Sequence, residues 1–322
     1  MLASATSSQK STSVRKTLAP ALVRTAFAVG SWIAPRRTIE RAADVFCTPS
    51  PIARRKAATA SDAGAAKSTL RVGANTIEVY RWGDPATQPY VLLVHGWSDY
   101  ALRFVPLADA LHAAGFAVVA FDQPGHGRST GETATLPEFA RCVRAVGERF
   151  GPAAAVIGHS MGGAAAAIAL HEGLDAARAI LIAPPADLAA AADRFADLVG
   201  LASHLREPLQ RHLEARASVT FEELEAHRNV REIDRPALVI HDIADREVPW
   251  SEGERYARFW PEARLLSTDG LGHGRIISDT NVIGATLDFY VGGPLGTKLC
   301  RRWSCPSVSP DGAACPVIGR TS

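Results

Sequence analysis

This 322-residue chain has almost no excess of charge of either sign. Its 35 basic and 33 acidic residues leave a formal net charge of +2 at pH 7. Proteins that bind nucleic acid or acidic surfaces usually carry a strong field of one sign. The charge balance therefore gives no support to a nucleic-acid partner, and none is expected.

Cysteine is also scarce, and its spacing excludes a disulfide scaffold. The five cysteines are odd in number, Cys47 and Cys142 stand alone, and Cys300, Cys305 and Cys315 gather near the C-terminus without C-x-x-C spacing. Paired or metal-binding cysteines normally show an even count or that spacing. The pattern predicts a reduced, cytoplasmic compartment, and we expect neither a metal nor a cofactor.

Long apolar runs are few, and the longest is broken. Residues 18–35 are mostly apolar and follow Lys10, Arg15 and Lys16, which resembles a signal sequence, but Arg24 interrupts the run. A membrane-spanning helix needs about 20 apolar residues. We expect an amphipathic helix that lies on the domain or loosely on a membrane.

The remaining composition is that of a globular protein. Hydrophobic residues make up 47% and charged residues 21% of the chain, and no internal repeat is present. Such values allow a sizeable core. We expect an N-terminal extension with one helical patch (1–66), one main domain (67–291) and a disordered tail (292–322), because periodicity is lost after Val291.

The main domain reads as alternating strands and helices. Two alternating runs joined by Gly73–Asn75 indicate a β-hairpin. Short apolar runs follow at 90–94, 117–121, 153–157, 179–182, 237–240 and 264–266. Strands that are apolar on both faces and separated by helices form parallel sheets covered on both sides. We therefore predict an α/β fold with a mostly parallel sheet and an N-terminal antiparallel hairpin.

One connection is too long for an ordinary crossover. Roughly fifty residues separate the run at 179–182 from that at 237–240, whereas most loops are short. The segment is rich in Ala, Leu, Glu and Arg and has apolar residues at helical spacing: Phe195, Leu198, Leu201 and Leu205. This predicts a small helical insertion at about 186–234, and its position suits a lid.

The strongest chemical signal is a G-x-S-x-G sequence. Gly158 and Gly162 flank Ser160 directly after a predicted strand and before an Ala-rich helix. A sharp strand-to-helix turn strains the serine backbone and leaves no room for side chains two residues away. The alternative is a chance glycine-rich turn. The context favours Ser160 as a nucleophile.

A serine nucleophile needs a base and a group that orients this base. His273 lies between glycines in a loop after the last strand, and Asp245 follows the strand after the insertion. The order Ser, Asp, His along the chain is that of the α/β-hydrolase triad. Two alternatives stay open: His273 as an exposed loop histidine, and Asp242 as the orienting acid.

Two backbone amides are expected to bind the substrate oxygen. Met161 starts the helix after Ser160, and Trp97 follows Gly96 in the loop after the strand at 90–94. Amides at such places can stabilise an oxyanion. The Trp97 side chain is equally compatible with a place in the core, since only its backbone is invoked.

These residues give the chain a resemblance to the α/β-hydrolase superfamily of esterases, lipases and S33 peptidases. The matching segments cover about Thr69 to Val291; they are His95–Trp97, Asp122–Ser129, Gly158–Gly163, Asp245–Pro249 and Gly272–His273. The resemblance implies that the second segment is a structural turn and that His126 in it is scaffold and not a base.

The expected activity is hydrolysis of an ester or thioester of a small or medium acyl substrate through an acyl-enzyme. The same triad also serves cofactor-free perhydrolases, acyltransferases and aminopeptidases, and the fold can serve as a non-catalytic ligand-binding protein.

Overall fold

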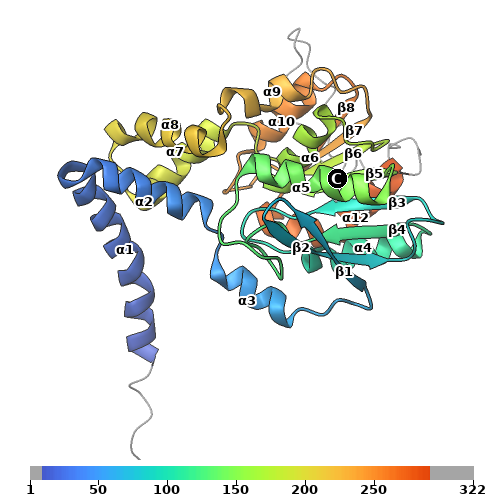
Figure 1. Ribbon diagram of the computed structural model, residues 1–322, viewed down its shortest axis with the longest axis horizontal. Coiled ribbons are helices and arrows are strands. Elements are labelled where there is room, and N and C mark those ends of the chain that lie inside the picture. The colour runs from blue at the N-terminus through green and yellow to red at the C-terminus, as the bar shows by residue number, and fades with distance from the viewer. Residues whose placement is uncertain (1–8, 291–322) are drawn as a thin grey trace, which may run out of the picture. The chain divides into compact units, whose positions relative to one another are not determined.

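An eight-stranded sheet occupies the middle of the chain in this computed structural model, which describes residues 9–290, with side chains from residue 21. Its order is β1-β2-β4-β3-β5-β6-β7-β8 (Figure 1). The strands are β1 (Ala66–Val72), β2 (Asn75–Trp82), β3 (Tyr90–Val94), β4 (Ala117–Phe121), β5 (Ala155–His159), β6 (Ala179–Ile182), β7 (Ala237–Asp242) and β8 (Ala263–Thr268). The expected tail 292–322 and its three cysteines lie outside the described residues.

The predicted architecture is confirmed. Strand β2 runs antiparallel to both β1 and β4, and all later pairs are parallel. In register, Leu92 of β3 lies beside Val119 of β4 and Val156 of β5. Parallel strands end at one edge of the sheet, so the loops that follow β3, β5, β7 and β8 gather there.

The sheet is buried on both faces. Leu93, Ile157 and Ile240 belong to an apolar cluster that also holds side chains of α4 and α12. Helices α5 and α6 pack on each other, and α6 and α10 contact the strands (Figure 1). The helices with this sheet are α3 (Pro51–Thr59), α4 (Val105–Ala113), α5 (Leu136–Phe150), α6 (Met161–His171), α9 (Ala226–Asn229), α10 (Trp250–Phe259), α11 (Gly272–Arg275) and α12 (Thr280–Tyr290).

Local signals account for the helix ends. Thr135 caps α5 in a full capping box with Glu138, and Gly151 ends this helix at a φ of 82°. The box satisfies two orphan amides, and glycine tolerates the positive φ without a Cβ penalty. Helix α6 is rich in alanine and buried on nearly all sides, which lets it sit close to the sheet behind Ser160.

The chain divides into two compact units. A sheet unit comprises Pro49–Ala186 and Leu224–Ser322, and a helical unit comprises Met1–Thr48 and Asp187–Glu223. The helices of the helical unit are α1 (Gln9–Ile33), α2 (Pro35–Cys47), α7 (Leu188–Val199) and α8 (Arg206–Ala217). Helix α3, within the expected extension 1–66, belongs to the sheet unit. The role of the insertion as a lid stays a prediction.

Contacts far apart in the sequence hold the helical unit together. Phe46 of α2 packs edge-on against Phe195 of α7, with ring centroids 5.2 Å apart. Arg216 of α8 pairs with Asp44 of α2 at 2.9 Å. The buried cluster draws on all four helices; it includes Phe27, Ala42, Ala43, Ala196, Leu209 and Leu213. Within residues 9–290, no helix combines the length and apolar character that a membrane span requires.

Candidate active site

Ser160 occupies the turn between β5 and α6, half-buried at the edge where the parallel strands end. Its φ of 52° and ψ of −129° are strained for a residue with a side chain. A Cβ on Gly158 would lie 2.4 Å from the carbonyl oxygen of Gly162, and one on Gly162 would lie 2.3 Å from that of Val94. Both flanking positions therefore require glycine, as the sequence predicts.

His273 and Asp245 meet as a buried pair. The Nδ1 atom of His273 lies 2.7 Å from Oδ2 of Asp245, and their side chains are 9% and 0% exposed. A carboxylate only accepts hydrogen bonds, so Nδ1 carries the hydrogen and Nε2 keeps a free lone pair. Of the alternatives left open by the sequence, this contact selects Asp245 as the partner of His273.

Asp245 is held as an anion by its surroundings. Its Oδ1 accepts hydrogen bonds from the amides of Glu247 and Val248, at 2.8 and 3.0 Å. Burial alone would raise the pKa of Asp245, but hydrogen bonds from the rings of His241 and His273 and from the Val248 amide lower this pKa below its usual value. The carboxylate is therefore charged throughout the neutral range.

Asp242 has a different task from Asp245. Its buried carboxylate accepts hydrogen bonds from Thr268 Oγ1 at 2.6 Å, the Leu271 amide at 2.9 Å and the Ala244 amide at 3.0 Å. Ala244 precedes Asp245, and Leu271 lies in the loop that leads to His273. Asp242 thus ties together the two loops that carry the pair. The sequence alone does not indicate this role, because a polar residue at the end of a strand is common.

His159 supports the main chain of His273. Its Nε2 donates to the carbonyl of His273 at 2.9 Å, and the two ring centroids are 4.9 Å apart. Burial lowers the pKa of His159 to about 3, so the ring is neutral. Because His159 directly precedes Ser160, this contact links the serine turn to the histidine loop. In the described part of the chain, no hydrogen bond joins Ser160 Oγ to the His273 ring.

The loop after β3 lies against the serine turn. A Cβ on Gly96 would fall 2.8 Å from the Cβ of Ser160, so glycine is what permits the approach. His95 Nδ1 donates to the Gly96 carbonyl at 2.7 Å, and the Gln123 amide donates to His95 Nε2 at 3.0 Å. A trans peptide points its C=O and N–H in opposite directions, so His95 also sets the direction of the Trp97 amide.

Trp97 and Met161 lie where the sequence predicts them. The Trp97 ring packs on those of His126 and Phe139, with centroids 5.0 and 6.2 Å away. The Trp97 side chain therefore has a structural role. Its amide belongs to the peptide bond that links it to Gly96. Met161 is the first residue of α6, where amides have no partner within the helix.

The segment Asp122–Ser129 serves as scaffold. The Asp122 carboxylate accepts hydrogen bonds from the Ala101 amide and the Tyr80 hydroxyl, at 2.8 and 3.0 Å. His126 Nε2 accepts the Ser98 amide at 3.0 Å, and burial lowers the pKa of His126 to about 3. A neutral ring with both nitrogens engaged cannot act as a base, which agrees with the scaffold role expected for His126.

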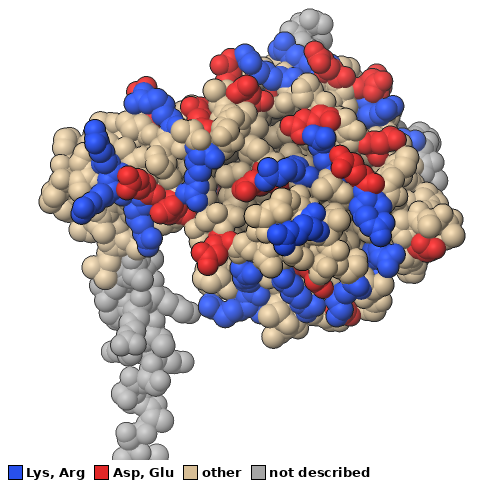
Figure 2. Space-filling model, viewed as in Figure 1, with Lys and Arg blue, Asp and Glu red and all other residues tan. Residues whose placement is uncertain are grey.

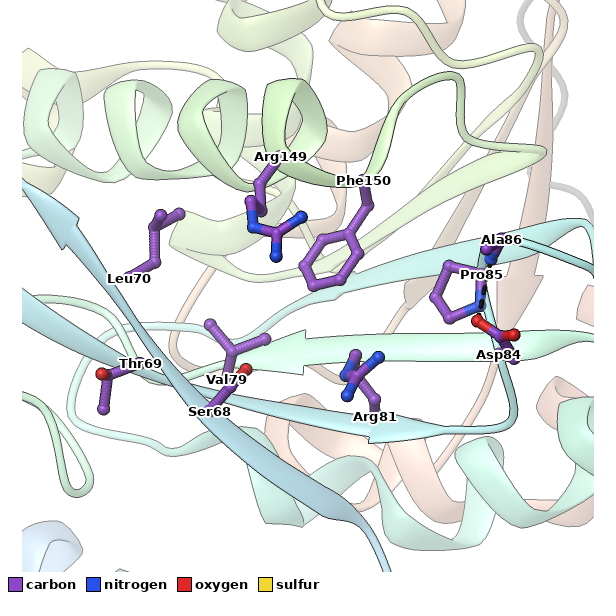
Figure 3. A pocket seen from close by; sticks show the side chains of 10 residues that line it. All are labelled: Ser68, Thr69, Leu70, Val79, Arg81, Asp84, Pro85, Ala86, Arg149 and Phe150. Carbon is purple, nitrogen blue, oxygen red and sulfur yellow. Dashed lines mark hydrogen bonds between the residues drawn. The ribbon is translucent and has the colours of Figure 1, made fainter.

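The pocket in Figure 3 lies elsewhere on the sheet unit. It has a volume of about 270 Å³ and is lined by the β1–β2 hairpin and the end of α5, with Arg81 and Arg149 facing it. Neither Ser160 nor His273 lines this pocket. Acidic and basic side chains are interspersed over the visible face of the sheet unit (Figure 2), so this face has no field of one sign.

Comparisons with known proteins find similarity to hydrolases. The profile of the serine aminopeptidase family S33 matches residues 85–240. The monoacylglycerol lipase of Mycolicibacterium smegmatis is 38% identical over 95 residues, which span 26% of this chain and 34% of that enzyme. The pimeloyl-[acyl-carrier protein] methyl ester esterase of Xanthomonas campestris is 27% identical over 248 residues, 63% of this chain and 95% of that enzyme.

A solved structure supports the same fold. Mouse alpha/beta hydrolase domain-containing protein 10 superposes with a TM-score of 0.58 at 18% identity, covering 70% of this chain and 98% of that one. Likeness at this identity concerns the fold alone. Together with the sheet order and the strained serine turn, it leads to one conclusion: this chain has the α/β-hydrolase fold.

Proposed function

We propose that the protein is a serine hydrolase that cleaves an ester or thioester of a small or medium acyl substrate. The observation that carries the proposal is the 2.7 Å contact between His273 Nδ1 and Asp245, on the loop that His159 joins to the Ser160 turn. An acid, a base and a strained serine at one sheet edge are the parts that acyl transfer requires.

In the proposed mechanism, Ser160 Oγ adds to the acyl carbonyl carbon while His273 Nε2 takes the hydroxyl proton. The tetrahedral adduct collapses, and the leaving alcohol or thiol takes this proton from Nε2. Water then attacks the acyl-serine, giving its proton to Nε2, and the free acid leaves as Ser160 regains a proton. Asp245 stays ionised and stabilises the imidazolium of each half-reaction.

The amides of Trp97 and Met161 are proposed to bind the oxyanion of both adducts. Loss of one such donor costs about 10² to 10³ in kcat in a serine protease that uses the same chemistry. His95 acts through Gly96 as a positioning residue, because its hydrogen bond to the Gly96 carbonyl orients the Trp97 amide. The expected substrate is a small molecule with an acyl carbonyl.

Ester chemistry is favoured because two relatives are named as a lipase and an esterase. Aminopeptidase activity is the second candidate, favoured by the description of the S33 family profile. Acyl transfer and perhydrolysis need only another acceptor in place of water. p-Nitrophenyl esters of graded chain length, acyl-CoA thioesters and aminoacyl p-nitroanilides, assayed side by side, separate these activities; anilide turnover above ester turnover would favour the second candidate.

We propose a cytoplasmic location for the catalytic reaction. Cys47 and Cys142 are buried as thiols, and burial raises the pKa of Cys142 to about 12. Thiols that form no disulfide fit a reducing compartment. Cell fractionation with an activity assay would test this, and recovery of the activity outside the cytoplasmic membrane would contradict it.

A fluorophosphonate probe tests the nucleophile itself. Intact-mass spectrometry should show one adduct on the wild-type protein, and peptide mapping should locate it on Ser160. Ser160→Ala should abolish the adduct, whereas Ser251→Ala, at an exposed serine of α10, should leave it unchanged. An unlabelled wild-type protein, or an adduct that survives Ser160→Ala, would favour the non-catalytic ligand-binding alternative.

A further inference from the structure

Helix α1 presents large apolar side chains that the rest of the helical unit leaves largely exposed, although Trp32 also contacts the His204 ring. Nine such side chains are exposed among the described residues, and five of them lie on α1: Leu22, Val23, Val29, Trp32 and Ile33. Trp32 and Ile33 are 76% and 78% exposed. Exposed apolar side chains are common singly, but a cluster on one element marks an interaction surface.

These side chains form one face because of the helical period. Successive residues of an α-helix are about 100° apart, which brings Leu22, Val29 and Ile33 to the same side. Phe27 and Ser31 point to the opposite side, and both are buried. We call the side of Leu22, Val29 and Ile33, with Trp32 at its edge, the outer face of α1.

The inner side fixes α1 to its unit. Phe27 belongs to the buried cluster of the helical unit, and Ser31 Oγ accepts the Ala202 amide at 3.2 Å. Arg24 donates to the carbonyl of Leu198 at 2.9 Å. Helix α1 therefore packs as part of the folded helical unit, and its outer face has a fixed orientation within this unit.

The charge of this segment has one sign only. Residues 1–39 contain six basic side chains and no acidic one; the basic residues are Lys10, Arg15, Lys16, Arg24, Arg36 and Arg37. Arg36 and Arg37 directly follow the outer face at the start of α2. Both are exposed, and neither forms an ion pair with another residue in the described part of the chain.

This combination fits an anionic lipid surface. An apolar helix face with an aromatic residue and flanking basic residues binds the interface through apolar burial and attraction to anionic headgroups. A second copy of the chain is a poorer occupant, because pairing two such faces would bring together two segments that carry only positive charge. We propose that the outer face of α1 docks the protein peripherally on anionic membranes. This proposal does not depend on the catalytic one.

Vesicle flotation of the full chain tests the proposal. The protein should float with phosphatidylcholine vesicles containing 30% phosphatidylglycerol and bind pure phosphatidylcholine about tenfold more weakly. Val29→Ser/Ile33→Ser should lower the partition coefficient by about tenfold or more, since both changes lie at exposed positions. Ile52→Ser/Ile243→Ser, at exposed apolar positions of the sheet unit, is the matched control and should bind like the wild type.

A second set of variants tests the contribution of the basic residues. Arg36→Glu/Arg37→Glu should remove the preference for phosphatidylglycerol while leaving the thermal unfolding midpoint unchanged, and 0.5 M NaCl should mimic it. Three results would overturn the proposal: no flotation of the wild type, equal flotation of wild type and Val29→Ser/Ile33→Ser, or a vesicle-free dimer in light scattering that Val29→Ser/Ile33→Ser dissolves. The last outcome would assign the face to a second copy.

Discussion

Gly96 is the residue on which the proposed oxyanion site depends most directly. Its backbone approaches the serine turn so closely that any Cβ would contact the Cβ of Ser160 at 2.8 Å and the carbonyl of His159 at 3.1 Å. Real Cβ atoms essentially never show a contact as short as 2.8 Å, so the loop after β3 or the serine turn must move when a side chain is added. A small displacement of one oxyanion donor is costly for catalysis.

Gly96→Ala should therefore lower kcat by about 10² or more, with a smaller change in KM, because the oxyanion forms only during the reaction. Gly274→Ala is the matched control: its Cβ would lie 4.0 Å from the nearest atom, a side-chain nitrogen of Arg103. Steady-state kinetics on a p-nitrophenyl ester compare the two variants. Equal kcat values for both would argue against an oxyanion role for this loop.

The carboxylate of Asp242 joins the loop after β7 to the loop after β8 through hydrogen bonds. Burial alone would raise the pKa of Asp242, but hydrogen bonds from Thr268 and from the amides of Leu271, Gly272 and Ala244 lower it. The anion is thus the form that holds the two loops. Hydrogen bonds to a buried charge are worth about 1.5–3 kcal/mol each, which suffices to fix the geometry of the neighbouring pair.

Asp242→Asn should lower kcat by about 10- to 100-fold with little change in KM, because an amide NH₂ group would face backbone donors and free the His273 loop. Asp279→Asn provides the control, since Asp279 also accepts two amides, at the start of α12 and not between these loops. Circular dichroism melts separate a global loss of fold from this effect. A normal kcat for Asp242→Asn would show that Asp242 does not position His273.

The sequence predicts the elements well where the signal is local. The strands at Tyr90–Val94, Ala117–Phe121 and Ala179–Ile182 are found as expected, since continuous apolar runs between helices leave few alternatives. The capping box at Thr135 starts α5. Thr220 and Glu223 form the same capping hydrogen bonds, yet only the short 3₁₀ turn Glu222–Leu224 follows them, because a cap does not set helix length.

Other features could not be predicted because they depend on distant contacts. The helical patch before Cys47 and the insertion after Asp187 form one unit, yet neither segment carries a local signal for the other. Similarly, the roles of His95 and His159 depend on partners at Gln123 and His273 that only the folded chain brings near. Motif and chain order indicated Ser160, Asp245 and His273, whereas their support is visible only in three dimensions.

At the scale of the whole molecule, three buried histidines make stability depend on pH. Burial lowers the pKa of His95 to about 4 and those of His126 and His159 to about 3, against about 6.5 in an unfolded chain. Below pH 6.5 these histidines bind protons in the unfolded state but not in the folded state. The folded state is therefore at full stability above this pH and loses stability as pH falls toward 4.

The free energy of unfolding from urea titrations should be nearly constant between pH 7 and 8 and decrease between pH 6.5 and 4, by about 1.4 kcal/mol per pH unit for each histidine. His126→Asn should reduce this slope by about one proton, because an amide can still join the Ser98 amide and the Pro124 carbonyl. An unfolding free energy that stays flat down to pH 5 would contradict neutral burial of these rings.

The proposed catalytic unit consists of Ser160, His273 and Asp245. Its most direct test is kcat on an activated ester for Ser160→Ala, His273→Ala and the double variant, each with its fold verified. We predict that each single change lowers kcat by about 10⁶-fold and that the kcat of the double variant is no lower than that of either single variant. A double variant whose loss is the product of the two single losses, or a single variant that keeps most of its activity, would contradict the account.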